Sequence, residues 1–584
     1  ILNSTLIIIV TFIPLFFLTG MEGRMLVPLG IAFIVALFAS TVVALTLTPV
    51  LCSYLLGKGK TDKDISREPF VARTLKKYYG QALEWALRHR TGVLGGTIAL
   101  FVAAMIVFFT LGSSFLPPFN EGSFTINVST LPGISLEESD NIGRRAEELL
   151  LEVPEIQTVA RKTGRAELDE HALGVNTSEI EAPFVLGDRS HAEVVADVRK
   201  KLSVIPGVNI EIGQPISHRI DAMLSGTQAR IAIKLFGDDL NRMFMLGNQI
   251  KKNISAIDGV VDLNVEQQIE RPQLKITPRR EMLARYGVSL SEFAEFIDVA
   301  LAGEVVSQVY EGSRTFDLTV KVKDDERSSA AKIGDLMVDT QDGKVPLSYL
   351  AEIKSATGPN TINRENVKRK IVISANVSDR DLRSVVDDIR ERIDETVVLP
   401  EGYFIEYGGQ FESEEAASRT LSFVSLFSLL VVFLLLYNQF RSVSQSAVIL
   451  LNLPLALIGG VFILRFTTGE ISIPAIIGFI SLFGIATRNG MLLVSHYNTM
   501  LSEGNSLHDT ILRGSLDRLN PILMTALTSA LALIPLALGG DLPGNEIQSP
   551  MAKVILGGLI TSTFLNAFVV PVVYWIMNRK KENR

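Results

Sequence analysis

The sequence contains a single cysteine, Cys52, so it cannot form a disulfide bond within the chain. A phosphate-binding loop of the Gly-x-x-x-x-Gly-Lys-Ser/Thr type is also absent, which leaves ATP hydrolysis unsupported. No combination of a nucleophile and a base indicates a hydrolase. The formal net charge of −7 is modest and argues against a nucleic-acid partner. These absences favour a protein that is not an enzyme.

Long uncharged apolar runs dominate what is present. Apolar residues make up 47% of the 584 residues, and the mean hydropathy is +0.30. A helix needs about 20 apolar residues to cross a hydrocarbon core of about 30 Å. Eight segments are predicted to be membrane helices: 2–19, 25–56, 92–111, 421–437, 447–464, 472–497, 521–538 and 554–577. They divide the chain into two helices in 1–56, one in 92–112 and five in 416–577, which indicates a polytopic α-helical membrane protein.

Acidic residues are missing from all eight predicted segments, although one of them contains an arginine. Arg488 lies well inside segment 472–497. A charge at the centre of a membrane helix costs roughly 2.5–3.5 kcal/mol, so it usually faces a partner or a water-filled path. Two interpretations stay open. Arg488 either reaches an interface as a structural residue, or its partner carboxylate lies outside these helices.

The charges between the segments predict the orientation. Lysine and arginine are concentrated on one set of connections: the loop 57–91, Arg441, Arg513, Arg518 and the tail 578–584. These connections are predicted to be cytoplasmic, which places the long block between 112 and 420 in the periplasm and the protein in a bacterial inner membrane. Within the loop, residues 69–90 predict an amphipathic helix on the membrane surface. Because apolar sequence begins directly at Ile1, we expect an upstream part.

Alternating strand and helix patterns divide the periplasmic block into two similar α/β units. Residues 113–213 follow the order βαββαβ, with strands 124–131, 156–164, 178–186 and 209–213 and helices 136–152 and 191–204. A second set occupies 214–270 and 360–415, with strands 230–236, 260–265, 369–377 and 403–408 and helices 240–257 and 382–396. Residues 271–359 interrupt it as an inserted module. Each unit is therefore predicted to be a ferredoxin-like subdomain.

Five motifs give the chain a resemblance to a known family. They are Phe115-Leu-Pro-Pro-Phe-Asn-Glu-Gly122, Ser129-Thr-Leu-Pro-Gly-Ile134, Gly213-Gln-Pro-Ile-Ser-His-Arg-Ile-Asp221, Gly478-Phe-Ile-Ser-Leu-Phe-Gly-Ile-Ala-Thr-Arg-Asn-Gly490 and Leu538-Gly-Gly-Asp-Leu-Pro-Gly-Asn-Glu-Ile-Gln-Ser-Pro550. With them, the whole chain resembles the resistance–nodulation–division (RND) transporters of the heavy-metal efflux branch, nearer to cobalt–zinc–cadmium pumps than to copper–silver pumps. Members have twelve membrane helices, so the resemblance implies that this chain corresponds to the fifth to twelfth.

The resemblance implies a secondary active transporter driven by protons. In RND transporters a carboxylate on the fourth helix is protonated during proton flux, and a basic residue on the tenth helix serves as its counter-charge. The match places Arg488 at that basic position, with Asn489 beside it. Arginine keeps its proton in practice, so it would be a fixed counter-charge. Hydroxyl groups on the last two helices either line a proton path or only contact neighbouring helices: Thr525, Thr528, Ser562 and Thr563.

The residues of the periplasmic block bear on the substrate. Soft copper(I) and silver(I) select thioether and thiolate ligands, whereas zinc and cobalt(II) accept imidazole and carboxylate. Copper-type relatives carry three methionines in the cleft, and the matching positions here are Asn127, the neighbourhood of Asn176 and Ala222, so a copper substrate is disfavoured. Candidate ligands for a divalent cation of the zinc, cobalt, cadmium or nickel type are Asp169, Glu170, His171, Glu179, Glu181, His218, Asp221 and Asn127. Each of these alone also fits a surface or capping residue, and His191 is interpreted as a surface residue.

Three functions stay open at this stage. The leading one is proton-driven efflux of divalent heavy-metal cations. An exporter of organic compounds has a similar scaffold, although the sparse phenylalanines of the first unit argue weakly against it. A non-transporting scaffold or secretion accessory does not explain Arg488. The resemblance further implies a homotrimer, a periplasmic adaptor protein and an outer-membrane channel, with 271–359 as the docking module and no cofactor besides the transported ion and the proton-motive force.

Overall fold

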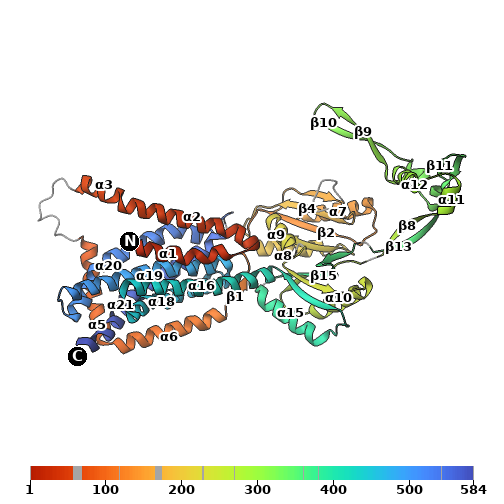
Figure 1. Ribbon diagram of the computed structural model, residues 1–584. Coiled ribbons are helices and arrows are strands. Elements are labelled where there is room, and N and C mark those ends of the chain that lie inside the picture. Colours follow the sequence, from red (N-terminus) through yellow and green to blue (C-terminus); the bar gives the residue numbers. More distant parts are fainter. Residues whose placement is uncertain are drawn as a thin grey trace.

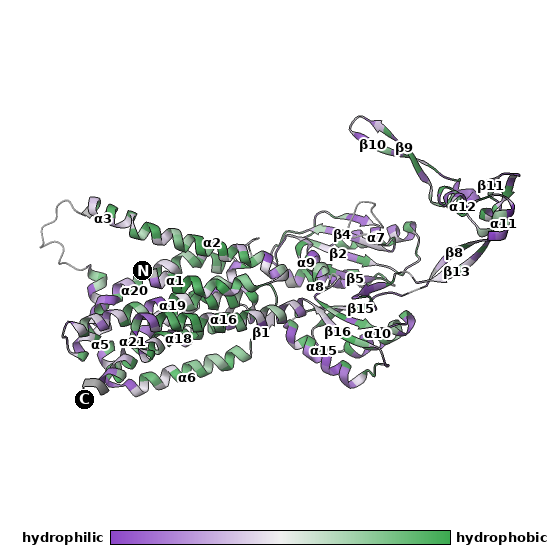
Figure 2. Ribbon diagram, in the orientation of Figure 1, coloured by the Kyte–Doolittle hydropathy of each residue, from purple (hydrophilic) through white to green (hydrophobic). Residues whose placement is uncertain are grey.

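The computed structural model describes residues 2–56, 69–117, 119–164, 174–226, 229–268, 270–359, 361–378, 380–540, 542 and 544–582. Figure 1 shows the long helices gathered at one end and two α/β units at the other, with an inserted module reaching farthest from the helices. Figure 2 shows that the helical end is mostly hydrophobic, whereas α7, α10 and α15 of the α/β units carry many hydrophilic residues.

Seven helical stretches in the described ranges are long and apolar enough to cross a membrane. They are α2 with α3 (Gly20–Leu45 and Leu47–Leu56), α6 (Arg90–Phe109), α16 (Gln410–Phe440), α17 with α18 (Val443–Leu450 and Asn452–Thr467), α19 (Ile473–Ser502), α20 (Leu507–Leu538) and α21 (Gln548–Glu582). The fold class predicted from the apolar runs is confirmed.

The first predicted membrane helix, residues 2–19, is shorter than expected. It consists of α1 (Leu2–Phe12) followed by a 3-10 helix, η1 (Ile13–Phe17). Pro14 stands at the start of η1 and lacks the N–H group that would continue the α-helical hydrogen bonds. Residues 3–17 form an apolar helical segment shorter than the seven long ones, so a spanning helix in this segment stays a prediction.

Several membrane helices extend beyond their predicted apolar runs, and these extensions contain acidic residues. Glu22 lies buried in the first turn of α2, and Glu414 lies near the start of α16, where Arg383 donates to it. The segments predicted from hydropathy exclude these carboxylates because charged residues lower the local hydropathy. The statement that the membrane helices lack carboxylates holds for the apolar runs but not for the whole helices.

Close helix packing places α19 and α21 among the most buried elements. Gly459 of α18 faces Gly557 of α21, and a Cβ on Gly459 would collide with the carbonyl oxygen of Gly557. Small residues at such a contact let two helix backbones approach within van der Waals distance. Helix α5 (Phe70–Arg88), the predicted amphipathic helix, packs against α20 and α21, and Tyr79 donates to the carbonyl of Ala567 at 2.7 Å. The rest of the predicted cytoplasmic loop, 57–68, lies outside the described residues.

The first unit is a four-stranded antiparallel sheet with two helices on one face. Its elements are β2 (Ser123–Ser129), α7 (Leu136–Leu151), β3 (Ala160–Thr163), β4 (Thr177–Pro183), α8 (His191–Leu202) and β5 (Asn209–Gly213). The strand order β3-β4-β2-β5 is that of a ferredoxin-like subdomain. Ile126, Ile180 and Ile212 point into the core that the helices cover.

The second unit repeats this order around an insertion. Its elements are β6 (Ile231–Phe236), α10 (Leu240–Ile254), β7 (Val260–Val265), β14 (Asn363–Glu365), β15 (Lys368–Val377), α15 (Leu382–Thr396) and β16 (Phe404–Gly409). The strands pair in the order β7-β15-β6-β16, with β14 added beside β15. A short parallel pair, β1 (Gly112–Ser114) with β17 (Glu470–Ser472), connects the end of α6 to the start of α19.

The inserted module leaves the second unit on two antiparallel strands, β8 (Arg271–Pro278) and β13 (Ala351–Gly358). It contains a hairpin of β9 (Glu304–Glu311) and β10 (Arg314–Val320) whose residues are all exposed. The other elements are α11 (Arg280–Arg285), α12 (Leu290–Ile297), η2 (Asp298–Ala302), η3 (Asp324–Arg327), α13 (Ala330–Gly334), β11 (Met337–Thr340), β12 (Gly343–Pro346) and α14 (Leu347–Leu350).

Candidate functional site

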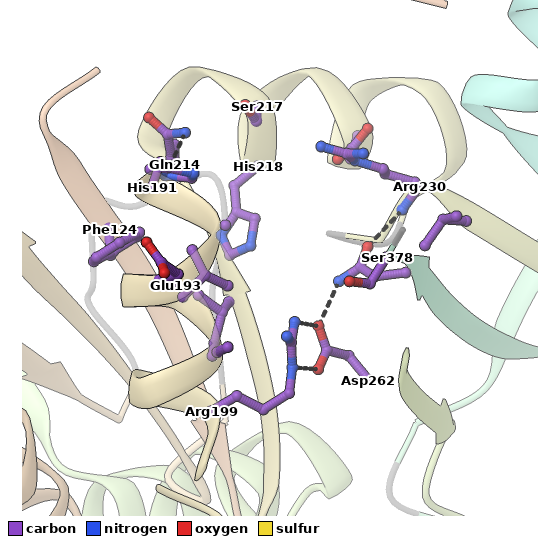
Figure 3. Close-up of a pocket in the computed structure, with 17 residues that line it drawn as sticks. Phe124, His191, Glu193, Arg199, Gln214, Ser217, His218, Arg230, Asp262 and Ser378 are labelled. Carbon is purple, nitrogen blue, oxygen red and sulfur yellow. Dashed lines mark hydrogen bonds and ion pairs between the residues drawn. The ribbon is translucent and has the colours of Figure 1, made fainter. Parts of the chain in front are cut away.

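A cavity of about 380 Å³ lies between the two α/β units, and we call it the inter-unit cavity (Figure 3). The first unit contributes α8 and β5, the second unit contributes β7 and the end of β15, and a connecting helix, α9 (Pro215–Ser225), lies over both. The polar and charged residues that line it are His191, Glu193, Arg199, Gln214, Ser217, His218, Asp221, Arg230, Asp262, Asn376 and Ser378.

Helix α9, which the strand and helix patterns did not predict, presents His218 to this cavity. Pro215 at the first helical position and Gly226 in the left-handed C-cap conformation define its ends. His218 is 4% exposed, and neither ring nitrogen has a hydrogen-bond partner among the described residues. Its ring lies against Gly213, the last residue of β5. Figure 3 shows the imidazole pointing from α9 into the cavity.

Burial controls the charge of this imidazole. Desolvation lowers the pKa of His218 to about 4, although the negative charges of Glu179 and Asp262 oppose the shift. The ring is therefore neutral at pH 7, and one ring nitrogen offers a lone pair. A neutral imidazole without a partner is the form that binds zinc and similar ions.

A row of three polar side chains crosses the first sheet beside His218. Asn127 on β2 stands opposite Glu179 on β4 and Glu211 on β5. Because Ile126, Ile180 and Ile212 face the core, these alternate residues lie on the other face of the sheet. Asn127 is 3% exposed, and neither its amide nitrogen nor its oxygen has a hydrogen-bond partner in the described parts.

The two carboxylates of this row differ in their surroundings. Lys162 lies 2.6 Å from Glu179, in an ion pair at the edge of the sheet. Glu211 is more enclosed, and desolvation followed by the charge of Asp262 raises its pKa. Glu211 accepts a hydrogen bond from Ser374 of the second unit at 3.4 Å.

Asp221 follows His218 by one helical turn on α9. It is buried, and Gln410 of α16 donates to it at 2.7 Å. Desolvation raises the pKa of Asp221 to about 6, with the hydrogen bond from Gln410 acting in the opposite direction. Asp221 and His218 line the same cavity, as the spacing in the sequence suggested.

The other sequence-predicted ligands are placed differently. Glu181 accepts hydrogen bonds from Thr125 and Ser123 on the neighbouring strand. Asn176 donates to the carbonyl of Thr130. Asp169, Glu170 and His171 lie outside the described residues. No three histidine, cysteine, aspartate or glutamate side chains in the described ranges come together as a metal site.

Sequence reasoning missed three residues of the site: Glu211, Asp262 and His191. Glu211 alternates with Ile210 and Ile212 on its strand, a period of two that marks it as facing away from the core. The interpretation of His191 as a surface residue is wrong, because its ring packs 5.6 Å from those of Phe124 and Phe184. Desolvation, and then the charge of Arg230, lowers the pKa of His191.

Arg488 lies at the middle of α19 and is partly buried. It has no hydrogen bond or ion pair with any described residue, whereas its neighbour Asn489 is fully buried. One turn further along the same face, Leu492 is 39% exposed. The face of α19 that carries Arg488 is therefore only partly covered by the other helices.

The hydroxyl groups predicted near the proton path mostly bond within their own helices. Thr525 donates to the carbonyl of Pro521 and Thr528 to that of Met524. Ser562 donates to the carbonyl of Leu559, while the buried hydroxyl of Thr563 has no hydrogen-bond partner in the described residues.

The sequence profile described as the AcrB/AcrD/AcrF family matches residues 1–578. The cobalt-zinc-cadmium resistance protein CzcA of Cupriavidus metallidurans is 33% identical over 591 residues, which cover 99% of this chain and 55% of that protein. The cation efflux system protein CusA of Escherichia coli is 29% identical over 602 residues, 98% of this chain and 56% of that protein. The chain thus spans about half the length of the curated relatives it matches.

Solved structures agree with this assignment. The crystal structure of a heavy metal efflux pump, crystal form II, superimposes with a TM-score of 0.82 at 28% sequence identity and covers 100% of this chain and 58% of that one. A second crystal form gives a TM-score of 0.83. The motif resemblance to RND transporters of the heavy-metal efflux branch is confirmed, and the chain belongs to the AcrB/AcrD/AcrF family.

Proposed function

We propose that this chain is the carboxy-terminal part of a proton-driven exporter of divalent heavy-metal cations in the inner membrane of a Gram-negative bacterium. The observation that carries the proposal is His218, a buried neutral imidazole that faces the inter-unit cavity and has no hydrogen-bond partner in the described part of the chain. The named relatives, which include a nickel and cobalt resistance protein of Cupriavidus metallidurans, support a cation as the substrate.

The donor atoms around the inter-unit cavity suit borderline divalent ions. Within the cavity His218 offers a ring nitrogen and Asp221 a carboxylate oxygen. Glu211 adds a carboxylate on β5, beside the lining residues Ile212 and Gly213. Zinc and cobalt(II) accept this mixture, whereas copper(I) and silver(I) select sulfur. The described residues that line the cavity include no methionine or cysteine. We therefore propose zinc, cobalt, cadmium or nickel as the transported ions.

Binding of the ion is expected to release protons. The raised pKa values of Glu211 and Asp221 mean that each carboxyl group holds its proton to a higher pH than in water. A divalent cation favours the ionised form of both groups, so it would expel these protons as it binds. Ligands that must lose protons give a site whose affinity depends on pH, which suits a transporter that must also release its substrate.

Arg488 would act as the fixed counter-charge of proton transport. Its guanidinium stays protonated and is without a partner in the described helices, so a carboxylate from another part of the protein would complete the pair. Asn489, the buried residue next to Arg488 on α19, would belong to the same proton-relay neighbourhood. Thr525 and Thr528 bond to their own helix, which makes them weaker candidates for the proton path.

The assembly proposed is a homotrimer with a periplasmic adaptor protein and an outer-membrane channel. The hairpin of the inserted module supports a partner surface, because it exposes apolar side chains on both strands: Val305, Val306, Val309, Tyr310, Phe316 and Leu318. In this arrangement the α/β units lie in the periplasm and residues 271–359 are the docking module.

The test uses the full-length pump in a metal-sensitive Gram-negative strain. The wild-type protein should restore growth in zinc, cobalt, cadmium or nickel, and His218→Ala should remove that tolerance. His508→Ala, an exposed histidine at the start of α20, is the matched control and should behave as wild type. Unchanged metal tolerance in His218→Ala would contradict the proposal. Tolerance to organic compounds alone would instead support the organic exporter.

A further inference from the structure

Asp262 occupies an unusual backbone position at the edge of the second unit. Its φ is 50°, in the left-handed region that an aspartate adopts only at an energetic cost. The pairing of β7 with β15 is irregular at this point, between the pairs of Ser374 and Asn376. Such irregularities re-aim a side chain out of the regular alternation of a strand. Here the carboxylate of Asp262 is turned toward the first unit.

Arg199 of α8 meets this carboxylate across the inter-unit cavity. Its Nε donates to Oδ1 of Asp262 at 2.8 Å and its Nη2 to Oδ2 at 3.0 Å, and Asn376 donates to Oδ2 at 3.1 Å (Figure 3). The Asp262 side chain is 5% exposed and that of Arg199 is 32% exposed. A buried carboxylate requires a compensating cation, and the two-point geometry of the guanidinium supplies it.

The same carboxylate is electrostatically coupled to the proposed substrate ligands. The charge of Asp262 opposes the lowering of the His218 pKa and contributes to the raised pKa of Glu211. Arg199, His218 and Asp262 line one cavity, and Glu211 lies on β5 next to the lining residue Ile212. Arg199 thus neutralises a carboxylate that a cation in this cavity would also attract.

We propose that Arg199 is a resident counter-cation of the unloaded cavity, and that an arriving divalent cation takes its place at Asp262. This inference rests on the proposed function. Arg199 competes with the substrate for the same carboxylate, so it weakens cation binding and returns to Asp262 when the ion leaves. Asp262 is then a substrate ligand, and Arg199 sets the affinity without contacting the ion.

Two single variants separate competition by Arg199 from a purely structural role of the pair. Competition predicts that they change zinc affinity in opposite directions, whereas a structural role predicts the same direction. Arg199→Gln removes the competitor and should tighten zinc binding about tenfold, whereas Asp262→Asn removes a ligand and should weaken it by a similar factor. If the pair only holds the two units together, both variants loosen the cavity and both weaken binding. Arg199→Lys keeps the charge but loses the two-point contact, so its affinity should lie between wild type and Arg199→Gln.

The experiment measures zinc binding to the purified full-length pump by isothermal titration calorimetry, with trimer assembly checked by size-exclusion chromatography. Arg144→Gln, which breaks an exposed pair with Asp140 on α7, is the control and should leave the affinity unchanged. In transport assays Arg199→Gln should lower both KM and kcat, since a tightly held ion leaves slowly.

Two failures are distinguishable. If the wild-type pump binds no zinc, cobalt, cadmium or nickel, the proposed function fails whatever the variants do. If the wild type binds zinc but Arg199→Gln binds it equally or more weakly, the proposed function stands and the exchange of Arg199 is overturned. If Arg199→Gln fails to assemble, Arg199→Lys replaces it in the measurement. Zinc affinity of Arg199→Lys equal to or weaker than that of the wild type would then overturn the exchange of Arg199.

Discussion

The imidazole ring of His218 lies directly on Gly213, where a Cβ of any other residue would overlap Nε2 and Cδ2 of the ring. Gly213 ends β5 in the row that also contains Thr125 and Glu181, next to the row of Asn127, Glu179 and Glu211. One glycine therefore lets a helix residue reach the polar face of the sheet.

Gly213→Ala should displace His218 and remove metal tolerance. The φ of Gly213 lies outside the left-handed region, so the backbone accepts alanine and the effect comes from the collision alone. Overpacking of this kind costs about 1–3 kcal/mol. Growth in zinc and the thermal unfolding midpoint measure the two effects. Gly187→Ala, in a loop of the same unit with open space around its Cβ, should change neither.

The buried His218 should make stability depend on pH. Its pKa is about 4 in the folded protein and about 6.5 when unfolded, so the unfolded state binds the extra proton between these values. In zinc-free buffer, the wild type should lose up to about 3 kcal/mol relative to His218→Gln as the pH falls from 6.5 to 4. Thermal unfolding midpoints at stepped pH values measure the difference. A constant difference across this range would show that the ring is not desolvated.

Arg488→Ala should abolish metal export while trimer assembly stays intact. Proton transport requires a positive charge on α19 that pairs with a carboxylate. Arg488→Lys keeps this charge and should therefore retain part of the export rate. Uptake of radioactive zinc into inverted vesicles with an imposed pH gradient measures the rate. Arg513→Ala, on the exposed first part of α20, is the control. Export at the wild-type rate by Arg488→Ala would exclude the proposed counter-charge.

Gly459→Ala should separate α18 from α21. The added Cβ meets the carbonyl oxygen of Gly557 and the hydroxyl of Thr561, which belong to a tightly packed helix. We expect a loss of about 1–3 kcal/mol, seen as a lower unfolding midpoint in detergent. Gly95→Ala on α6 has open space around its Cβ and should be neutral or slightly stabilising. Equal midpoints for the two variants would contradict the packing argument.

The apolar runs predicted most of the membrane helices, because about 20 apolar residues in a row have few alternatives to a spanning helix. The lengths were less predictable. Pro14 shortened the first helix, while α16 and α20 extend well beyond their apolar runs into charged sequence. Polar turns at a helix end carry no hydrophobic signal, so their helical state depends on capping and neighbours.

The candidate site was predictable in part. His218 and Asp221 could be identified from their spacing, and both line the inter-unit cavity. Glu181 matched the same chemistry but bonds to Thr125 on the next strand. Asp262 gave no sequence signal, since its position depends on a backbone irregularity created by pairing with a strand more than a hundred residues away.

By itself, the sequence determined the membrane helices, the two ferredoxin-like units and the family. The periodicity of hydrophobic residues and the local motifs that indicate them depend only on residues close together in the chain. Only the tertiary structure decided which polar groups meet. Strand pairing brought Asn127 between Glu179 and Glu211, and the seating of α9 on Gly213 added His218. The Arg199–Asp262 pair likewise exists only because the two α/β units face each other across a cavity. Such contacts join residues far apart in the chain, so no local pattern records them.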